Sequence, residues 1–202
     1  ILGVPDNDFT KLFTVGIQLG AILAVVVLYW KKFIDFKSWH FYLKLLVAVI
    51  PALVLGFIFS DKIDALLESS LTVAISMIAG GIILLFIDNV FNAAKIDTEE
   101  QVSFPKAFII GLWQCIAMIP GVSRSAASII GGMQQGLTRK LAAEFSFFLA
   151  VPTMAAATGY KMLKGYKTLN TEHIKLLAIG NVVAFIVAML AIKFFIGFLQ
   201  KH

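Results

Sequence analysis

The stretch PKAFIIGLWQCIAMIPGVSRSAASIIGGMQQGL, from Pro105 to Leu137, decides the fold of this chain. Its first apolar part, Lys106–Ile119, has 14 residues and as a helix reaches roughly 21 Å, against about 30 Å for the hydrocarbon core of a bilayer. Pro120 and Gly121 then break the helix, and a second short apolar piece, Ala126–Met133, follows. Two half-helices joined by a polar turn predict a re-entrant helical hairpin at about 105–137. The alternative is one kinked span over 107–133.

The composition is that of an all-α, polytopic membrane protein. Of the 202 residues, 59% are hydrophobic and only 14% are charged, which favours a bilayer over water as the solvent. The short segment Asp61–Glu68 is amphipathic and predicts a helix that lies at the membrane interface. The net charge of +5 comes from lysines scattered in loops, which points to lipid headgroups and not to nucleic acid. Blocks of about 20 apolar residues predict spanning helices at Phe13–Trp30, Phe41–Phe59, Leu71–Phe91, Leu141–Tyr160 and Ile174–Leu199.

The chain also shows a sign of internal duplication. A shift of 131 positions lays Tyr29 on Tyr160 and Lys44-Leu45-Leu46 on Lys175-Leu176-Leu177. Such identities arise by chance in apolar chains, so only the shared layout of span, lysine-bearing loop and span carries weight. We predict a single transmembrane domain over 1–202, with a partial first repeat over 1–100 and a second repeat over 101–202. By this reasoning a first hairpin would precede the chain and a last span, missing here, would follow it.

The turn of the predicted hairpin carries the groups that an oligo-anion needs. Gly121 lets the backbone turn so that successive N–H groups converge, and Ser123 and Ser125 add hydroxyl donors beside the positive end of the following helix. Arg124 supplies a fixed charge whose planar fork suits phosphate oxygens, and at membrane depth this charge demands an anionic partner. The alternative is an arginine that extends to the headgroups, with serines bonded to nearby carbonyls.

Other polar groups in the apolar segments have weaker signals. Gln18 lies between Gly16 and Gly20, a spacing of small residues that favours close helix packing, so we expect it to form an interhelical hydrogen bond. Gln114 lies six residues before the Pro120 turn and is a candidate to line the same cavity. No histidine shows metal-ligand or triad spacing, and no acidic pair for a divalent metal accompanies Arg124 in the sequence. The sequence therefore predicts a phosphate cradle without metal ligands.

Pro120-Gly121-Val122-Ser123-Arg124-Ser125 resembles the Pro-Gly-x-Ser-Arg-Ser signature of the bacterial undecaprenyl-pyrophosphate phosphatases, the bacitracin-resistance family. The similarity covers essentially the whole chain. It extends to Gly111–Cys115, to Glu144–Phe147 and to Ile17–Val25. The resemblance implies two inverted repeats, each with a re-entrant hairpin and three spans, with the two hairpins meeting at the active site.

The resemblance also implies an activity and its residues. The family hydrolyses the terminal phosphate of undecaprenyl diphosphate and so recycles the lipid carrier of peptidoglycan precursors. By this resemblance Arg124 is the phosphate-binding catalytic arginine, with Ser123 and Ser125 as flanking ligands. Ser128 stands where the family often has threonine, and serine at this position retains the hydroxyl group. With Gly121 and Gln114, these serines form the predicted substrate-binding set, and a carrier or flippase for an anionic lipid is the alternative function.

One motif of the family has no match here. It is a glutamate-rich stretch leading into Pro-Val-Ser-Ser-Thr-Gly-His, which supplies the carboxylates for a divalent metal (Mg or Ca), a serine nucleophile and a histidine. The sequence thus predicts a fragment whose metal ligands lie outside it and which is inactive when expressed alone. We further expect a multi-pass protein of the bacterial inner membrane, surrounded by membrane lipids. A homodimer is one oligomeric state left open.

Overall fold

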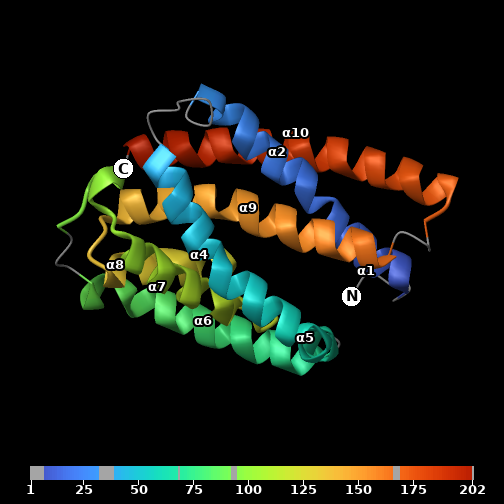
Figure 1. Ribbon diagram of the computed structural model, residues 1–202, viewed down its shortest axis with the longest axis horizontal. Coiled ribbons are helices and arrows are strands. Elements are labelled where there is room, and N and C mark those ends of the chain that lie inside the picture. The colour runs from blue at the N-terminus through green and yellow to red at the C-terminus, as the bar shows by residue number, and fades with distance from the viewer. Residues whose placement is uncertain (1–6, 32–38, 68, 92–94, 166–168, 202) are drawn as a thin grey trace. The chain divides into compact units, whose positions relative to one another are not determined.

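The computed structural model describes residues 7–31, 39–67, 69–91, 95–165 and 169–201, and these residues are predominantly helical (Figure 1). The helices are α1 (Asp8–Gly16), α2 (Gln18–Leu28), α4 (Trp39–Ile58), α5 (Ser60–Leu67), α6 (Ser70–Val90), α7 (Phe104–Cys115), α8 (Arg124–Gln134), α9 (Arg139–Gly165) and α10 (Thr171–Lys201), with the 3-10 turns η2 (Glu99–Gln101) and η3 (Ile116–Met118). The prediction of an all-α chain is confirmed. Parts of the expected connections, residues 68, 92–94 and 166–168, lie outside the described residues.

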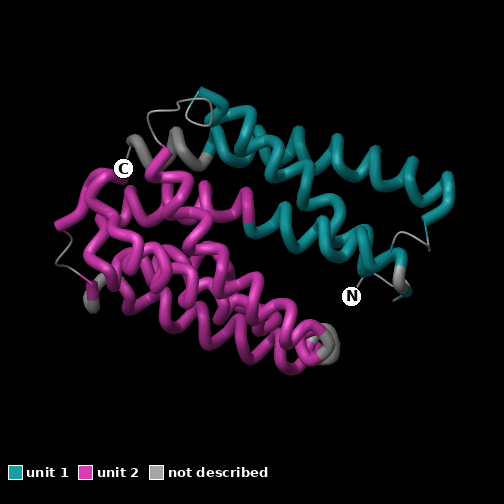
Figure 2. The backbone as a smooth tube through the Cα atoms, viewed as in Figure 1, with its two compact units in different colours: residues 1–36, 153–202 teal, residues 37–152 magenta. Residues whose placement is uncertain are grey.

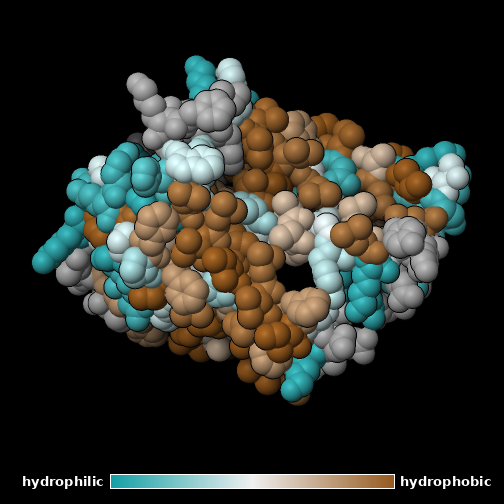
Figure 3. Space-filling view, viewed as in Figure 1, coloured by the Kyte–Doolittle hydropathy of each residue, from teal (hydrophilic) through white to brown (hydrophobic). Residues whose placement is uncertain are grey.

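Within the described part of the chain, five helical segments are long and apolar enough to cross a membrane: Phe9–Leu28, Trp39–Ile58, Ser70–Ile87, Arg139–Gly165 and Thr171–Phe194. Each overlaps one of the five expected spans, and α5 falls on the expected interfacial segment. Apolar side chains are exposed along these helices and cover much of the face in Figure 3. Such a surface suits lipid and not water. The chain is therefore a multi-pass membrane protein.

The chain divides into two compact units (Figure 2). Unit 1 comprises residues 1–36 and 153–202, and unit 2 comprises residues 37–152. The long helix α9 contributes to both, because its first half lies in unit 2 and its second half in unit 1. The predicted hairpin lies entirely in unit 2. This division groups residues by contact and does not test whether the chain contains two repeats. The single domain with repeats over 1–100 and 101–202 therefore stays a prediction.

In unit 1, close packing joins α1 and α2 to α10. A Cβ atom added to Gly20 would run into the backbone carbonyl of Asn181, and one added to Gly16 would lie 2.8 Å from Leu177 Cδ2. The backbone N–H of Gly20 donates to Asn181 Oδ1 at 2.7 Å. The small residues at 16 and 20 thus allow the close approach that their spacing predicted. Among the described groups, the polar contact across this approach comes from Asn181, and the interhelical hydrogen bond expected of Gln18 stays a prediction.

In unit 2, α4 packs against both α7 and α9. The carbonyl oxygen of Ala48 in α4 lies where a Cβ atom of Gly111 in α7 would sit, so only glycine allows this approach. Phe41 meets Phe145 and Phe148 of α9 edge-to-face, with ring centroids 5.9 and 5.4 Å apart. These contacts hold α7, the first half of the hairpin, against two long helices.

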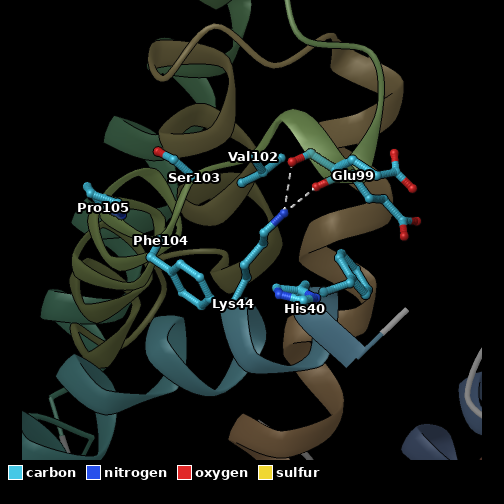
Figure 4. A pocket seen from close by; sticks show the side chains of 9 residues that line it. His40, Lys44, Glu99, Val102, Ser103, Phe104 and Pro105 are labelled. Atoms are coloured by element: carbon cyan, nitrogen blue, oxygen red, sulfur yellow. Dashed lines mark hydrogen bonds between the residues drawn. The ribbon is translucent and has the colours of Figure 1, made fainter. Parts of the chain in front are cut away.

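Lys44 of α4 is a buried cation with a structural role. Its side chain is only 6% exposed, and Nζ donates to the backbone carbonyl oxygens of Glu99 at 2.9 Å and Glu100 at 3.1 Å. Figure 4 shows the side chain reaching from α4 to η2, at the edge of a pocket of about 500 Å³ that His40 and Phe104 also line. Because η2 leads directly into α7, Lys44 fixes the point where the hairpin begins.

We expect Lys44→Met to destabilise the protein by about 1.5–3 kcal/mol, because hydrogen bonds to a charged group contribute about this much and methionine keeps the apolar stem. Thermal unfolding in detergent, followed by tryptophan fluorescence, measures the change. The matched control is Lys140→Met, since Lys140 is exposed, and a change there stays within about 0.5 kcal/mol. Equal melting temperatures for the two variants would show that the buried hydrogen bonds of Lys44 do not stabilise unit 2.

Candidate phosphate-binding site

The predicted hairpin is present, and its two arms pack against each other. Trp113 Nε1 in α7 donates to Gln134 Oε1 near the end of α8 at 2.6 Å. Lys106 Nζ, at the start of α7, donates to the backbone oxygen of Gln135 at 2.6 Å. The chain therefore returns to the side from which it started. The arms have 12 residues in α7 and 11 in α8, so each is roughly 17–18 Å long. This is too short to cross the hydrocarbon core of a bilayer. The single kinked span is excluded.

The turn of the hairpin depends on one glycine. Gly121 has φ +91°, a conformation that side chains rarely adopt. A Cβ atom there would run into the carbonyl oxygen of Val73 in α6 and would lie 3.1 Å from Ser76 Cβ. Pro120, which precedes it, has no backbone N–H to continue α7 and η3. The tip is thus both sharply bent and pressed against α6, which fixes where α8 begins.

The N-terminus of α8 presents donors at this tip. Ser123 is the N-cap residue, and its Oγ accepts the backbone N–H of Ala126 at 3.3 Å. Ser125 Oγ lies 3.2 Å from Ser123 Oγ, and both serines are exposed. The first N–H groups of a helix have no partner within the helix and carry its positive dipole end. Hydroxyl and backbone donors therefore converge at one exposed point, an arrangement that favours an anion.

Arg124 is the first residue of α8, and one of its donors has no partner among the described residues. Its Nη1 atom is buried and makes no hydrogen bond to any group in the described part of the chain. A buried donor without an acceptor costs about 1–3 kcal/mol, and more when it is charged. The side chain as a whole is only partly buried, so an external acceptor has access to the region. A bound anion that accepts from Nη1 would remove this cost.

Two other members of the predicted substrate-binding set lie in helix packing. Ser128 is 1% exposed and Gln114 is 3% exposed. The Oγ atom of Ser128 is within hydrogen-bonding distance of Ser146 Oγ at 2.7 Å, and Gln114 Nε2 donates to the carbonyl oxygen of Ala48 at 3.1 Å. The structure therefore brings Gly121, Ser123, Arg124 and Ser125 together at the tip. It places Ser128 and Gln114 where the hairpin meets α9 and α4.

Comparison with known protein families gives a match over the whole chain. The family model described as bacitracin resistance protein BacA matches residues 1–202. The chain belongs to the BacA family. The membership predicted from Pro120–Ser125 is thereby confirmed.

Several relatives of this BacA-family chain are named undecaprenyl-diphosphatase. The undecaprenyl-diphosphatase of Flavobacterium psychrophilum is 62% identical over 203 residues, which cover 99% of this chain and 76% of the relative. The undecaprenyl-diphosphatase of Flavobacterium johnsoniae is 59% identical over 204 residues, with 99% and 76% covered. That of Aquifex aeolicus is 45% identical over 205 residues, with 100% and 79% covered. Nearly the whole of this chain therefore aligns with each relative, and each alignment covers about three quarters of the relative.

Sequence reasoning missed Ser146, the partner of Ser128 on α9. Ser146 is 2% exposed and stands between two phenylalanines in the apolar run of the fourth span. The one signal in the sequence that could have pointed to Ser146 is that it is a lone serine in an apolar span. It shows that a polar group is present but does not show which helix it faces. From α9, outside the hairpin of this BacA-family chain, Ser146 contacts Ser128 of α8, one turn after Arg124.

Proposed function

We propose that this protein is a membrane hydrolase that removes the terminal phosphate of undecaprenyl diphosphate, giving undecaprenyl phosphate and inorganic phosphate. The observation that carries the proposal is the buried Nη1 of Arg124 at the N-terminus of α8, which has no hydrogen-bond partner among the described residues. Membership of the BacA family and the name undecaprenyl-diphosphatase among its relatives support it. The product is the lipid carrier of peptidoglycan precursors, so the reaction returns the carrier to use and contributes to bacitracin resistance.

In the proposed reaction, a water oxygen is added to the terminal phosphorus, and the bond from that phosphorus to the bridging oxygen breaks. Negative charge is spread over the oxygens of the transferred phosphoryl group in the transition state. Arg124 holds these oxygens through its planar fork, and its charge persists because a guanidinium does not lose its proton. Ser123, Ser125 and the first N–H groups of α8 add neutral donors. The site stabilises charge where it develops and needs little rearrangement to do so.

Gly121, Ser123, Arg124 and Ser125 form the proposed phosphate-binding set. We leave Ser128 and Gln114 out of it because their polar atoms are buried and bonded to protein groups. Their proposed role is to hold the hairpin on its neighbours.

The divalent metal implied by the family resemblance does not fit the groups at this tip. The side chains at the tip are hydroxyls and a positively charged guanidinium, which repels a cation, and they offer none of the carboxylate oxygens that sites for Mg and Ca commonly use. Among the described residues, no group of three or more His, Cys, Asp or Glu side chains is placed to hold an ion. We therefore derive no step through a metal.

The proposed setting is the inner membrane of a bacterial cell. The diphosphate is held at the tip of α8, and the apolar chain of the substrate extends among lipid tails that surround the spans. The proposed binding partners are the polyprenyl diphosphate and membrane lipids, with no nucleic acid. A homodimer is a further arrangement that the proposal allows.

The test separates hydrolysis from transport. The protein, expressed from its own gene, is reconstituted in sealed vesicles that contain a polyprenyl diphosphate, and both phosphate release and lipid movement between leaflets are measured. We expect phosphate release that is lost in Arg124→Ala. Translocation of the intact diphosphate without phosphate release would contradict the hydrolase and would favour the alternative function, a carrier with broken helices that binds an anionic lipid.

A further inference from the structure

Two buried serines connect α8 to α9 in unit 2. Ser128 Oγ and Ser146 Oγ are 2.7 Å apart, and the two residues are only 1% and 2% exposed. Ser128 Oγ is also 3.0 Å from the backbone oxygen of Arg124 and 3.2 Å from that of Ser125. Water does not compete for these groups because they are buried. The hydroxyl of Ser146 therefore reaches the backbone of Arg124 through one intervening hydroxyl.

The direction of the two protons follows from the acceptors. A serine hydroxyl has one proton, and backbone carbonyl oxygens can only accept. If Ser128 donates to the Arg124 and Ser125 carbonyls, its oxygen is free to accept the proton of Ser146. The opposite direction would leave those carbonyl contacts without a proton. The chain of hydrogen bonds thus runs from Ser146 to Ser128 and on to the carbonyl of Arg124.

Ser146 is held in a rigid part of the unit. Its neighbours Phe145 and Leu149 are buried at 1% and 0% exposure. One turn away on each helix, a Cβ atom added to Gly132 would lie 2.9 Å from Ala142 Cβ, so α8 and α9 also approach closely there. A serine hydroxyl that bonds to the carbonyl four residues earlier bends the start of a helix. The Ser146 contact therefore sets the geometry of the turn from which the Arg124 side chain projects.

We propose that Ser146 is a positioning residue for Arg124. It donates to Ser128 and thereby fixes the first turn of α8, so that the guanidinium is held in the direction needed by the phosphate. The proposal rests on the proposed function for its effect on turnover. The structural claim, that Ser146 fixes the first turn of α8, does not depend on that function.

The first experiment compares Ser146→Ala with wild type in phosphate release, using the protein expressed from its own gene. Alanine leaves Ser128 without its donor, so the Arg124 guanidinium is held less precisely against the phosphoryl oxygens of the transition state. We therefore expect kcat to fall roughly 10-fold to 100-fold with little change in KM. Ser146→Cys retains a weak donor and should fall between the two. The matched control is Thr158→Ala, which removes another buried hydroxyl of α9, one that donates to the Val15 carbonyl at 3.3 Å in unit 1. Thr158→Ala should lower the melting temperature without this loss of kcat.

The second experiment distinguishes positioning from a general loss of stability. If Ser146 acts through Arg124, adding Ser146→Ala to Arg124→Lys should reduce kcat by less than twofold beyond Arg124→Lys alone, because coupled residues are not additive. An equal loss in both backgrounds overturns the proposal. So does a wild-type kcat in Ser146→Ala.

A third measurement does not depend on turnover. Hydrogen exchange of the 202-residue chain in detergent should show faster exchange of the amides of Ala127 and Ser128 in Ser146→Ala, but not in Thr158→Ala. If the wild-type protein releases no phosphate, the proposed function fails and this measurement alone decides the structural part. Unchanged exchange at the start of α8 in Ser146→Ala overturns it.

Discussion

Arg124→Lys should reduce phosphate release from a polyprenyl diphosphate by roughly 100-fold to 1000-fold, the usual effect of losing one preorganised contact to a developing charge. Lysine keeps the positive charge but loses the planar fork that binds two phosphate oxygens together. Because Arg124 Nη1 has no hydrogen-bond partner within the described part of the chain, the substitution breaks no hydrogen bond of that atom to a described residue. The variant should therefore insert and fold, with a melting temperature close to that of wild type. Initial rates in detergent measure the effect.

The chain provides a natural control, since its second arginine is Arg139. Arg139 begins α9 and is exposed, so Arg139→Lys should keep the wild-type rate. A similar rate for Arg124→Lys and Arg139→Lys would remove Arg124 from the site.

Gly111→Val should cause the largest structural defect. A Cβ atom at this position would overlap the carbonyl oxygen of Ala48 and lie 2.8 Å from the carbonyl carbon, and backbone on a neighbouring helix cannot move aside cheaply. Overpacking of this kind costs about 1–3 kcal/mol and sometimes more. We expect little monodisperse protein after extraction and a lower melting temperature for what remains, measured by size-exclusion chromatography and thermal unfolding.

Gly80→Val is the matched control in the same unit. A Cβ atom at Gly80 in α6 meets no atom of the described residues within 4 Å, so the substitution introduces no clash with them. It should leave the yield unchanged. Equal loss of folded protein from both variants would mean that the approach of α7 to α4 does not limit the fold.

The hairpin could be predicted from the sequence because its cause is local. The apolar run Lys106–Ile119 is too short to cross a bilayer, and Pro120-Gly121 ends it, so both facts are read from consecutive residues. The five spans are predicted for the same reason. The grouping of Ser123, Arg124 and Ser125 at one helix start also follows from adjacency along the chain.

The partners of single polar residues could not be predicted in this way. Spacing along one helix shows that Ser128 and Gln114 are polar, but it does not show which neighbouring helix each one faces. Their burial against Ser146 and Ala48 depends on how α8 and α7 approach α9 and α4. The contact of Asn181 with the Gly20 amide has the same origin, because it joins residues far apart in the chain. Long-range packing decides these roles.

The most direct test of the proposed site is a structure of the protein with a non-hydrolysable polyprenyl methylene-diphosphonate. We predict a terminal phosphonate oxygen at about 2.7–2.9 Å from Arg124 Nη1, the usual length of a charge-assisted hydrogen bond, with Ser123 or Ser125 donating to the same group. A diphosphonate bound elsewhere in the protein, with Arg124 Nη1 bonded to a protein carbonyl or to a lipid headgroup, would contradict the assignment.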